Sequence, residues 1–283
     1  MSRRQIILVS LLVCSVSAYG QEIPGLSYCL LFDSYLEKDA FQQSKSDKCD
    51  PLIFLLANDP AIDSLRYKQI NAEIELYASR LKTKQKKFES ERKFLRHLFN
   101  SVHRKYLKNY ETLETFDGIF NGGSYNCVSG TALYACLLGQ LGYSVKIHET
   151  RYHIFLLIHL PDSSRVMFET TDPRWGFETD GGRIDNRIKS YLSEERKTLQ
   201  RAGTLSAPFN DDQILESVSL KEVAGLHYYN IAVDLINRAN YYDAFRALKK
   251  ASILYPRSKR IRDFLWYTQQ RHESKLSEAF VNN

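Results

Sequence analysis

The stretch from Tyr152 to Leu160 constrains the fold more than any other, because it is an almost unbroken apolar run of strand length. Such a run is typical of a strand buried on both faces of a sheet. Residues 144–149 alternate apolar and polar side chains, which predicts a neighbouring strand. After a polar turn at 161–164, residues 165–171 predict an antiparallel partner, which Asp172-Pro173 stops. We therefore expect a small antiparallel sheet with 152–160 at its centre.

Segments with helical character precede this sheet. Residues 125–141 carry an apolar stripe, with the chain-breaking pair Gly122-Gly123 before it and Gly142, a suitable C-terminal cap, after it. Further upstream, 52–58 and 65–110 predict helices, and the charged run KTKQKKFESERK reads as the solvated face of the longer one. Residues 174–186 predict a loop. The expected fold class is α+β.

The chain becomes helical again from about Leu220. Two amphipathic stretches within 228–256 flank a turn at 238–240, and Pro256 ends the second one. Small residues lie where the two helices would cross, so the segment resembles a tetratricopeptide hairpin. Residues 258–276 would start a second unit or cap the first. Because so few repeats cannot build a long solenoid, we expect a packing element.

The first twenty residues predict a secretory signal. Arg3 and Arg4 precede an apolar core at 6–13 that is too short to span a bilayer, and a cleavage site lies near Ala18. We expect an exported protein, periplasmic or secreted, without a transmembrane span in the mature chain. A lipoprotein anchored at Cys14 is the alternative, but the preceding residue is not the small one that such motifs favour.

Charge and cysteine content exclude some classes of protein. The formal net charge of +6, less the two arginines of the signal, gives +4. This mild excess does not indicate binding to nucleic acid. Beyond the signal, Cys29 and Cys49 have the option of pairing, but four cysteines allow three connectivities and the sequence does not choose. No His/Cys spacing predicts a metal site.

Cys127 is the strongest candidate for a reactive residue, because it stands at the start of the predicted helix. Free N–H groups and the positive end of the helix dipole favour a thiolate there. The structural alternative is a small buried residue, which is common for free cysteine and is the default for Cys136 within the same helix.

A nucleophilic cysteine needs a base and a group that orients the base. His153 starts the central strand, while His148 and His159 are its rivals on the neighbouring and the same strand. Glu169 is a lone carboxylate in an apolar strand, where it needs a partner, and Asp172 follows three residues later. Asp172 has an alternative role as a turn cap, since it precedes a proline.

The stretches NCVSGTALYACLLGQLGY, YHIFLLIHL and VMFETTDPRWGF together resemble the transglutaminase-like core, a papain-like Cys-His-Asp superfamily. On this resemblance Cys127 matches the nucleophile and His153 the base. Glu169 matches the third member, with Asp172 as the alternative. The chain departs from the family where Ile154 replaces the usual Trp after the histidine.

The resemblance implies a papain/transglutaminase-like core, a Cys-bearing helix against a small antiparallel sheet, with flanking N-terminal helices and a C-terminal helical hairpin. The domain layout is then a signal peptide at 1–20, an N-terminal helical region at 21–110, the transglutaminase-like core at 111–215 and a tetratricopeptide-like tail at 220–283.

The function implied is that of an exported cysteine enzyme acting on peptide or protein amides, either a hydrolase (protease or amidase) or a transamidase. The catalytic triad would be Cys127, His153 and Glu169 or Asp172, and the family's chemistry requires no cofactor and no metal. The alternative is a non-catalytic transglutaminase-like and tetratricopeptide scaffold. Its cleft and tail would bind peptides or a protein partner in the cell envelope.

Overall fold

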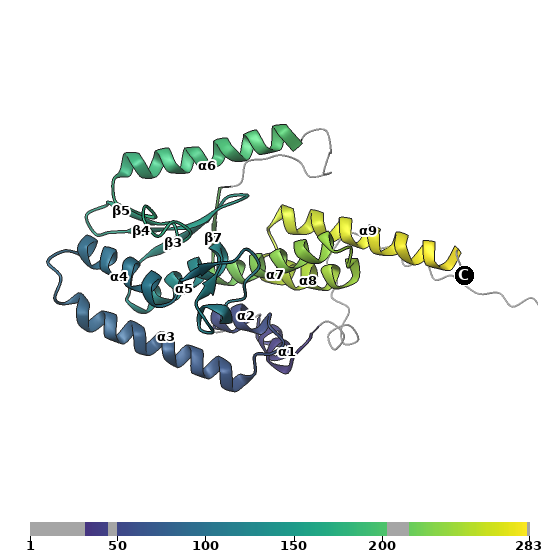
Figure 1. Ribbon diagram of the computed structural model, residues 1–283, viewed down its shortest axis with the longest axis horizontal. Helices are drawn as coiled ribbons and strands as arrows, with labels where there is room; N and C mark the ends of the chain where they lie inside the picture. Colours follow the sequence, from purple (N-terminus) through teal and green to yellow (C-terminus); the bar gives the residue numbers. More distant parts are fainter. Residues whose placement is uncertain (1–31, 45–49, 203–214, 282–283) are drawn as a thin grey trace, which may run out of the picture. The chain divides into compact units, whose positions relative to one another are not determined.

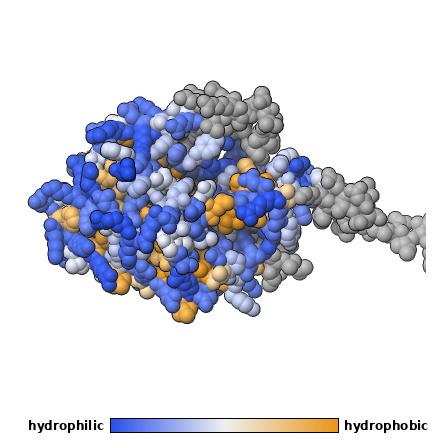
Figure 2. Space-filling view, in the orientation of Figure 1, coloured by the Kyte–Doolittle hydropathy of each residue, from blue (hydrophilic) through white to orange (hydrophobic). Residues whose placement is uncertain are grey.

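The computed structural model describes residues 32–44, 50–202 and 215–281. The predicted signal at 1–20, Cys29 and Cys49 lie outside these residues. The described part combines helices with a five-stranded antiparallel sheet, which confirms the α+β class. The face shown in Figure 2 is largely hydrophilic, with small separate hydrophobic areas. Within the described ranges, none of the helices has the length and apolar character needed to cross a membrane.

The strand β4 (Ile154–His159) lies at the centre of the sheet. The strand order is β6-β5-β4-β3-β7, with bounds β3 (Val145–Glu149), β5 (Arg165–Phe168), β6 (Phe177–Glu178) and β7 (Glu216–Val218). β4 is buried at every position except its last, which confirms the prediction of a central strand. Leu156 pairs with Phe168, so the start of β4 and the end of β5 meet at the same end of the sheet.

Helices cover both faces of this sheet (Figure 1). On one face, Leu156 and Ile158 of β4 join the main buried cluster that includes α5 (Cys127–Gln140). On the other face, Phe155 and Leu157 pack with residues of α6 (Gly181–Ala202). Burial of β4 on both faces therefore depends on both helices.

The loop predicted at 174–186 is wrong in its second half, because α6 begins at Gly181. The Asp180 carboxylate accepts a hydrogen bond of 2.8 Å from the backbone N–H of Arg183, as an N-terminal cap does. Ile184 and Tyr191 then face the sheet at helical spacing. The glycines at the helix start hid this pattern in the sequence.

The helix α5 agrees closely with the predicted helix at 125–141. Asn126 is its N-cap, and a reciprocal capping box joins Asn126 with Ser129. Gly142 has a φ of +82°, as expected of a left-handed residue after a helix end. Gly122 and Gly123, with φ of +114° and +88°, make the turn before the helix. Cys127 is consequently the first residue of the helix.

The single helix predicted at 65–110 is in fact two helices, α3 (Ser64–Gln85) and α4 (Glu91–Lys105). Ser90 causes the break: its φ of −149° is extended, and its side chain accepts a hydrogen bond from the N–H of Lys93. The charged run thus spans two helix ends. The other N-terminal elements are the helices α1 (Tyr35–Gln42) and α2 (Pro51–Ala57), the 3₁₀ turn η1 (Asp117–Ile119) and the short paired strands β1 (Asn109–Tyr110) and β2 (Ser124–Tyr125).

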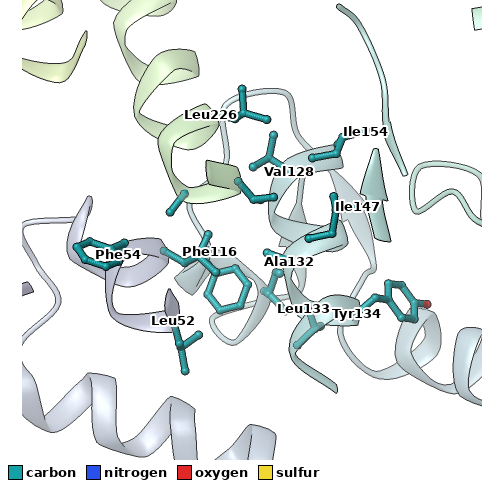
Figure 3. Close-up of a cluster of buried hydrophobic side chains, with 14 of the residues drawn as sticks. Leu52, Phe54, Phe116, Val128, Ala132, Leu133, Tyr134, Ile147, Ile154 and Leu226 are labelled. Carbon is teal, nitrogen blue, oxygen red and sulfur yellow. The ribbon is translucent and has the colours of Figure 1, made fainter. Parts of the chain in front are cut away.

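The C-terminal helices α7 (Leu220–Asn237) and α8 (Tyr241–Leu254) form the predicted antiparallel hairpin, and α9 (Lys259–Val281) follows. Their crossing is close: a Cβ at Gly225 would lie 2.9 Å from the Cβ of Tyr255. The hairpin packs on the rest of the molecule, because Leu226 of α7 belongs to the same buried cluster as Val128 of α5 and Ile154 of β4 (Figure 3).

A buried ion pair joins this hairpin to the N-terminal helices. The ammonium of Lys250 lies 2.9 Å from the carboxylate of Glu37, and the hydroxyl of Tyr228 donates to the same carboxylate at 2.8 Å. Lys250 also lies 2.9 Å from Asp33. Side-chain exposure is only 4% for Lys250 and 2% for Glu37. Because water cannot solvate either group, each buried charge depends on the other for its stabilisation.

We expect Lys250→Met to lower the free energy of unfolding by about 3–5 kcal/mol, because it leaves the Glu37 carboxylate buried without its cation. Urea denaturation monitored by circular dichroism measures this loss. Lys249→Met is the matched control: Lys249 is the exposed neighbour on the same helix and should change stability little. Equal effects of the two substitutions would contradict a structural role for the buried pair.

Candidate active site

The three residues of the predicted site come from the ends of neighbouring elements. Cys127 begins α5, His153 directly precedes β4, and Glu169 directly follows β5. The first two turns of α5 contact these strand ends. The hydroxyl of Thr131 donates to the carbonyl of Ile154 at 3.4 Å, and a Cβ at Gly130 would lie 3.1 Å from the Thr170 hydroxyl oxygen. The structure therefore gathers the start of α5 and both strand ends at one end of the sheet.

Cys127 is a free, half-buried thiol, and its pKa is raised to about 11. Burial is the main cause, and the Glu169 carboxylate adds to it by disfavouring a second negative charge. The backbone N–H groups of Cys127 and Val128 act in the opposite direction, as expected of a helix N-terminus. The helix end is thus present as predicted, but burial and Glu169 outweigh it, so the resting thiol is protonated.

His153 belongs to the turn between β3 and β4. Its backbone N–H donates to the Thr150 hydroxyl at 3.0 Å, and its carbonyl accepts from the Thr150 N–H at 2.8 Å. The imidazole ring stacks on the ring of Tyr191 of α6, with centroids 4.1 Å apart. Burial lowers the pKa of His153, while the carboxylates of Glu169 and Glu194 oppose that shift. Among the hydrogen bonds of the described residues, none joins this ring to the Cys127 sulfur.

Glu169 is buried, with 3% of its surface exposed. One carboxylate oxygen accepts hydrogen bonds from the backbone N–H and the hydroxyl of Thr171, at 3.0 Å and 2.6 Å. The other lies 3.5 Å from the guanidinium of Arg187. Since its charge acts on the pKa of both Cys127 and His153, Glu169 is electrostatically linked to both other members of the predicted triad.

Asp172, the alternative third member, is engaged differently. One oxygen accepts from the backbone N–H groups of Arg174 and Trp175 at 3.2 Å and 2.9 Å, which is the turn-capping role that the sequence suggested. The other accepts from Arg187 at 2.9 Å. The charge of Asp172 is among the main influences on the pKa of His103. It is not among the main influences on the pKa of Cys127 or of His153. Of the two carboxylates, Glu169 is thus the one whose charge acts on the pKa of both Cys127 and His153.

The rival histidines lie elsewhere. His159 is the exposed last residue of β4, at the opposite end of the strand from His153. His148 of β3 stacks on Phe155 with centroids 5.5 Å apart.

Two site residues of α6 were missed, because no helix was predicted to follow the loop at 174–186. Arg187 bridges Glu169 and Asp172, and its Nε donates to the hydroxyl of Tyr191 at 2.7 Å. The ring of Tyr191 in turn stacks against the ring of His153. The helical spacing of Ile184, Ile188 and Tyr191 was the signal that could have located them.

Three comparisons with known proteins found no match: no family model, no curated protein and no solved structure matches this chain. Within the described residues, no cluster of three or more His, Cys, Asp or Glu side chains is arranged to hold a metal ion.

The first test concerns the charge of Glu169. We expect alkylation of Cys127 by iodoacetamide, followed by peptide mapping, to titrate with a pKa near 11 in the wild type. Glu169→Gln removes a negative charge that opposes the thiolate, so it should lower the thiol pKa and accelerate alkylation at pH 8. Asp185→Asn, which alters a carboxylate paired with Arg165 at 3.0 Å, is the control. An unchanged titration in Glu169→Gln would contradict the coupling.

The second test concerns the loop that holds Glu169. The N–H of Glu169 donates to the carbonyl of Gly176 at 2.8 Å, and a Cβ at Gly176 would lie 2.0 Å from the Glu169 carbonyl oxygen. We expect Gly176→Ala to lower the free energy of unfolding by about 1–3 kcal/mol in urea, because the backbone must move apart. Gly139→Ala, at a helical position with nothing within 4 Å, should instead raise stability by about 0.5–1 kcal/mol.

Proposed function

We propose that this chain is an exported cysteine enzyme of transglutaminase-like type that acts on amide bonds, with Cys127 as nucleophile, His153 as general base and Glu169 as the orienting carboxylate. The observation that carries the proposal is that Cys127, His153 and Glu169 stand where the start of α5, the start of β4 and the end of β5 come together at one end of the sheet. The position of Cys127 at the start of α5 supports it, since the backbone N–H groups there suit an oxyanion.

The reaction starts from a neutral pair in this proposal. The thiol pKa is raised and the imidazole pKa is lowered, so at neutral pH both groups are uncharged. As the sulfur attacks the amide carbonyl, the thiol proton passes to His153, and the buried carboxylate of Glu169 stabilises the imidazolium. The C–N bond then breaks, the amine leaves with that proton, and a thioester remains on Cys127.

The thioester is resolved by a second nucleophile. Water gives hydrolysis, as in a protease or amidase, and an amine gives transamidation. His153 takes the proton of the incoming nucleophile and returns it to the sulfur as the thioester breaks. For this cycle the imidazole must turn from its stack on Tyr191 toward the sulfur.

A non-catalytic scaffold is the second candidate, and two observations favour it. The thiol pKa of about 11 opposes nucleophilic attack at neutral pH. In addition, Thr171 and Arg187 occupy the Glu169 carboxylate. In this function the end of the sheet that holds Cys127 and the helical tail bind a peptide or a protein of the cell envelope without turnover.

Activity assays distinguish the two candidates. We expect the wild type to hydrolyse fluorescein-labelled casein or purified peptidoglycan sacculi, or to attach dansylcadaverine to casein. Cys127→Ala should abolish this activity, and His153→Gln should lower kcat about 10²- to 10⁴-fold. Cys136→Ala and His159→Gln are the matched controls and should keep it.

The pH dependence follows from the lowered pKa of His153. Only the neutral imidazole accepts a proton, so activity should persist below pH 6.5 and fall as the pH drops through the lowered pKa.

If the wild type is no more active than Cys127→Ala in all three of these assays, the enzyme proposal is wrong and the scaffold remains.

A further inference from the structure

The strongest unexplained feature near the site is a pair of carboxylates that face each other in the sheet. Glu149, the last residue of β3, pairs directly with Glu216 of β7. Like charges directly opposite in an antiparallel ladder are destabilising. Glu149 is only 3% exposed, and burial raises the pKa of its carboxyl, with the charge of Glu216 adding to the shift. Such a pair requires cations from outside the sheet.

The connection between α8 and α9 supplies a cation to one carboxylate, and the first turn of α9 supplies a cation to the other. Arg260, in the first turn of α9, donates a hydrogen bond from its guanidinium to the Glu149 carboxylate. Arg257 donates to Glu216 at 2.8 Å, and the hydroxyl of Tyr255 donates to the same oxygen of Glu216 at 2.8 Å. The C-terminal helices therefore neutralise charges at the end of the sheet where the site lies.

Arg260 also forms a hydrogen bond to the turn that contains His153. A second nitrogen of its guanidinium donates to the backbone carbonyl of Arg151 at 2.9 Å. Arg151 lies inside the turn that Thr150 and His153 close. The guanidinium also makes a cation–π contact with Tyr229 on α7, because its central carbon lies 4.6 Å from the centroid of that ring. Its side chain is 13% exposed, so water competes little for these contacts.

We propose that Arg260 is a positioning residue for His153, and that the C-terminal helices are thereby a working part of the site rather than a separate binding module. The planar guanidinium of Arg260 donates hydrogen bonds both to Glu149 at the end of β3 and to the carbonyl of Arg151 in the turn. These two bonds fix the position at which the backbone of His153 enters β4. The role of His153 as general base rests on the proposed function; the mechanical link does not. In addition, the positive charge of Arg260 favours the thiolate form of Cys127.

The test compares Arg260→Met with Arg262→Met. Arg262 is the matched control, because it lies in the same helical turn, is exposed, and also donates to a backbone carbonyl, that of Pro256, at 2.9 Å. The first readout is the ¹³C-detected titration of the His153 ring, assigned with His153→Gln. The groups that face this ring are Tyr191, Arg187 and Glu194 of α6, and Glu169 after β5.

We expect Arg260→Met to loosen the turn, release the ring from its buried stack and move the His153 pKa up toward the ordinary value of about 6.5. The titration of His97 on α4, remote from the turn, should not change. On an active wild type, kcat should fall about tenfold to hundredfold with little change in KM, since misplacement of a base affects the chemical step. Arg262→Met should alter neither quantity.

Arg260→Lys covers the case in which Arg260→Met does not fold. A lysine ammonium reaches either Glu149 or the Arg151 carbonyl but lacks the fork, so it should give an intermediate shift of the His153 titration. If folded Arg260 variants lower only the melting temperature and keep the wild-type His153 titration, the inference is wrong. A shifted titration in a protein without turnover supports the link while it removes the proposed enzyme function, so the two failures are separable.

Discussion

Burial of β4 on both faces is the constraint on which the rest of the structure depends. A strand without a polar face is stable only when a layer of side chains covers each side. The helix α5 supplies one layer and carries Cys127 at its first residue, while α6 supplies the other and carries Tyr191. Because β4 runs antiparallel to β5, the residue before one strand and the residue after the other lie at the same end of the sheet. The candidate site is therefore a product of the same packing that buries the core.

Buried carboxylates add a second level of organisation. Glu37, Glu149 and Glu169 are each 2–3% exposed, and each has a cation from a distant part of the chain: Lys250, Arg260 and Arg187. A buried carboxylate without a partner is costly, so each pair selects one arrangement of the segments that it joins. Two of the three cations come from the C-terminal helices. These helices are consequently fixed to the N-terminal helices at one place and to the sheet at another.

Features that depend on local pattern were predictable from the sequence. The central position of β4, the start of α5 near Cys127 and the cap at Gly142 follow from hydrophobic runs and from the backbone freedom of glycine. The break before α4 was also encoded locally, in Ser90, but the charged run around it suggested a continuous helix. The start of α6 was missed because its two glycines resemble a loop more than the first turn of a helix.

The pairings within the site were not predictable, since they depend on burial and on partners far along the chain. Arg187 lies 18 residues after Glu169, and Arg260 lies 111 residues after Glu149. No spacing rule links such residues before the fold brings them together. The protonation of Cys127 shows the same limit. A helix N-terminus alone predicts a lowered thiol pKa, whereas burial and Glu169, which only the tertiary structure reveals, raise the pKa of Cys127.

The opposite shifts at Cys127 and His153 have a chemical consequence of their own. A thiol pKa that is raised and an imidazole pKa that is lowered both disfavour a resting thiolate–imidazolium pair. In the proposed reaction, proton transfer must accompany the attack on the carbonyl, when the charge moves from sulfur to the oxyanion and the backbone N–H groups of α5 stabilise it. In that reaction Glu169 has opposite effects on the two states: it opposes the free thiolate before the attack and stabilises the imidazolium during it. In the proposed enzyme, a buried carboxylate in this position keeps the thiol inert until a substrate takes over the negative charge.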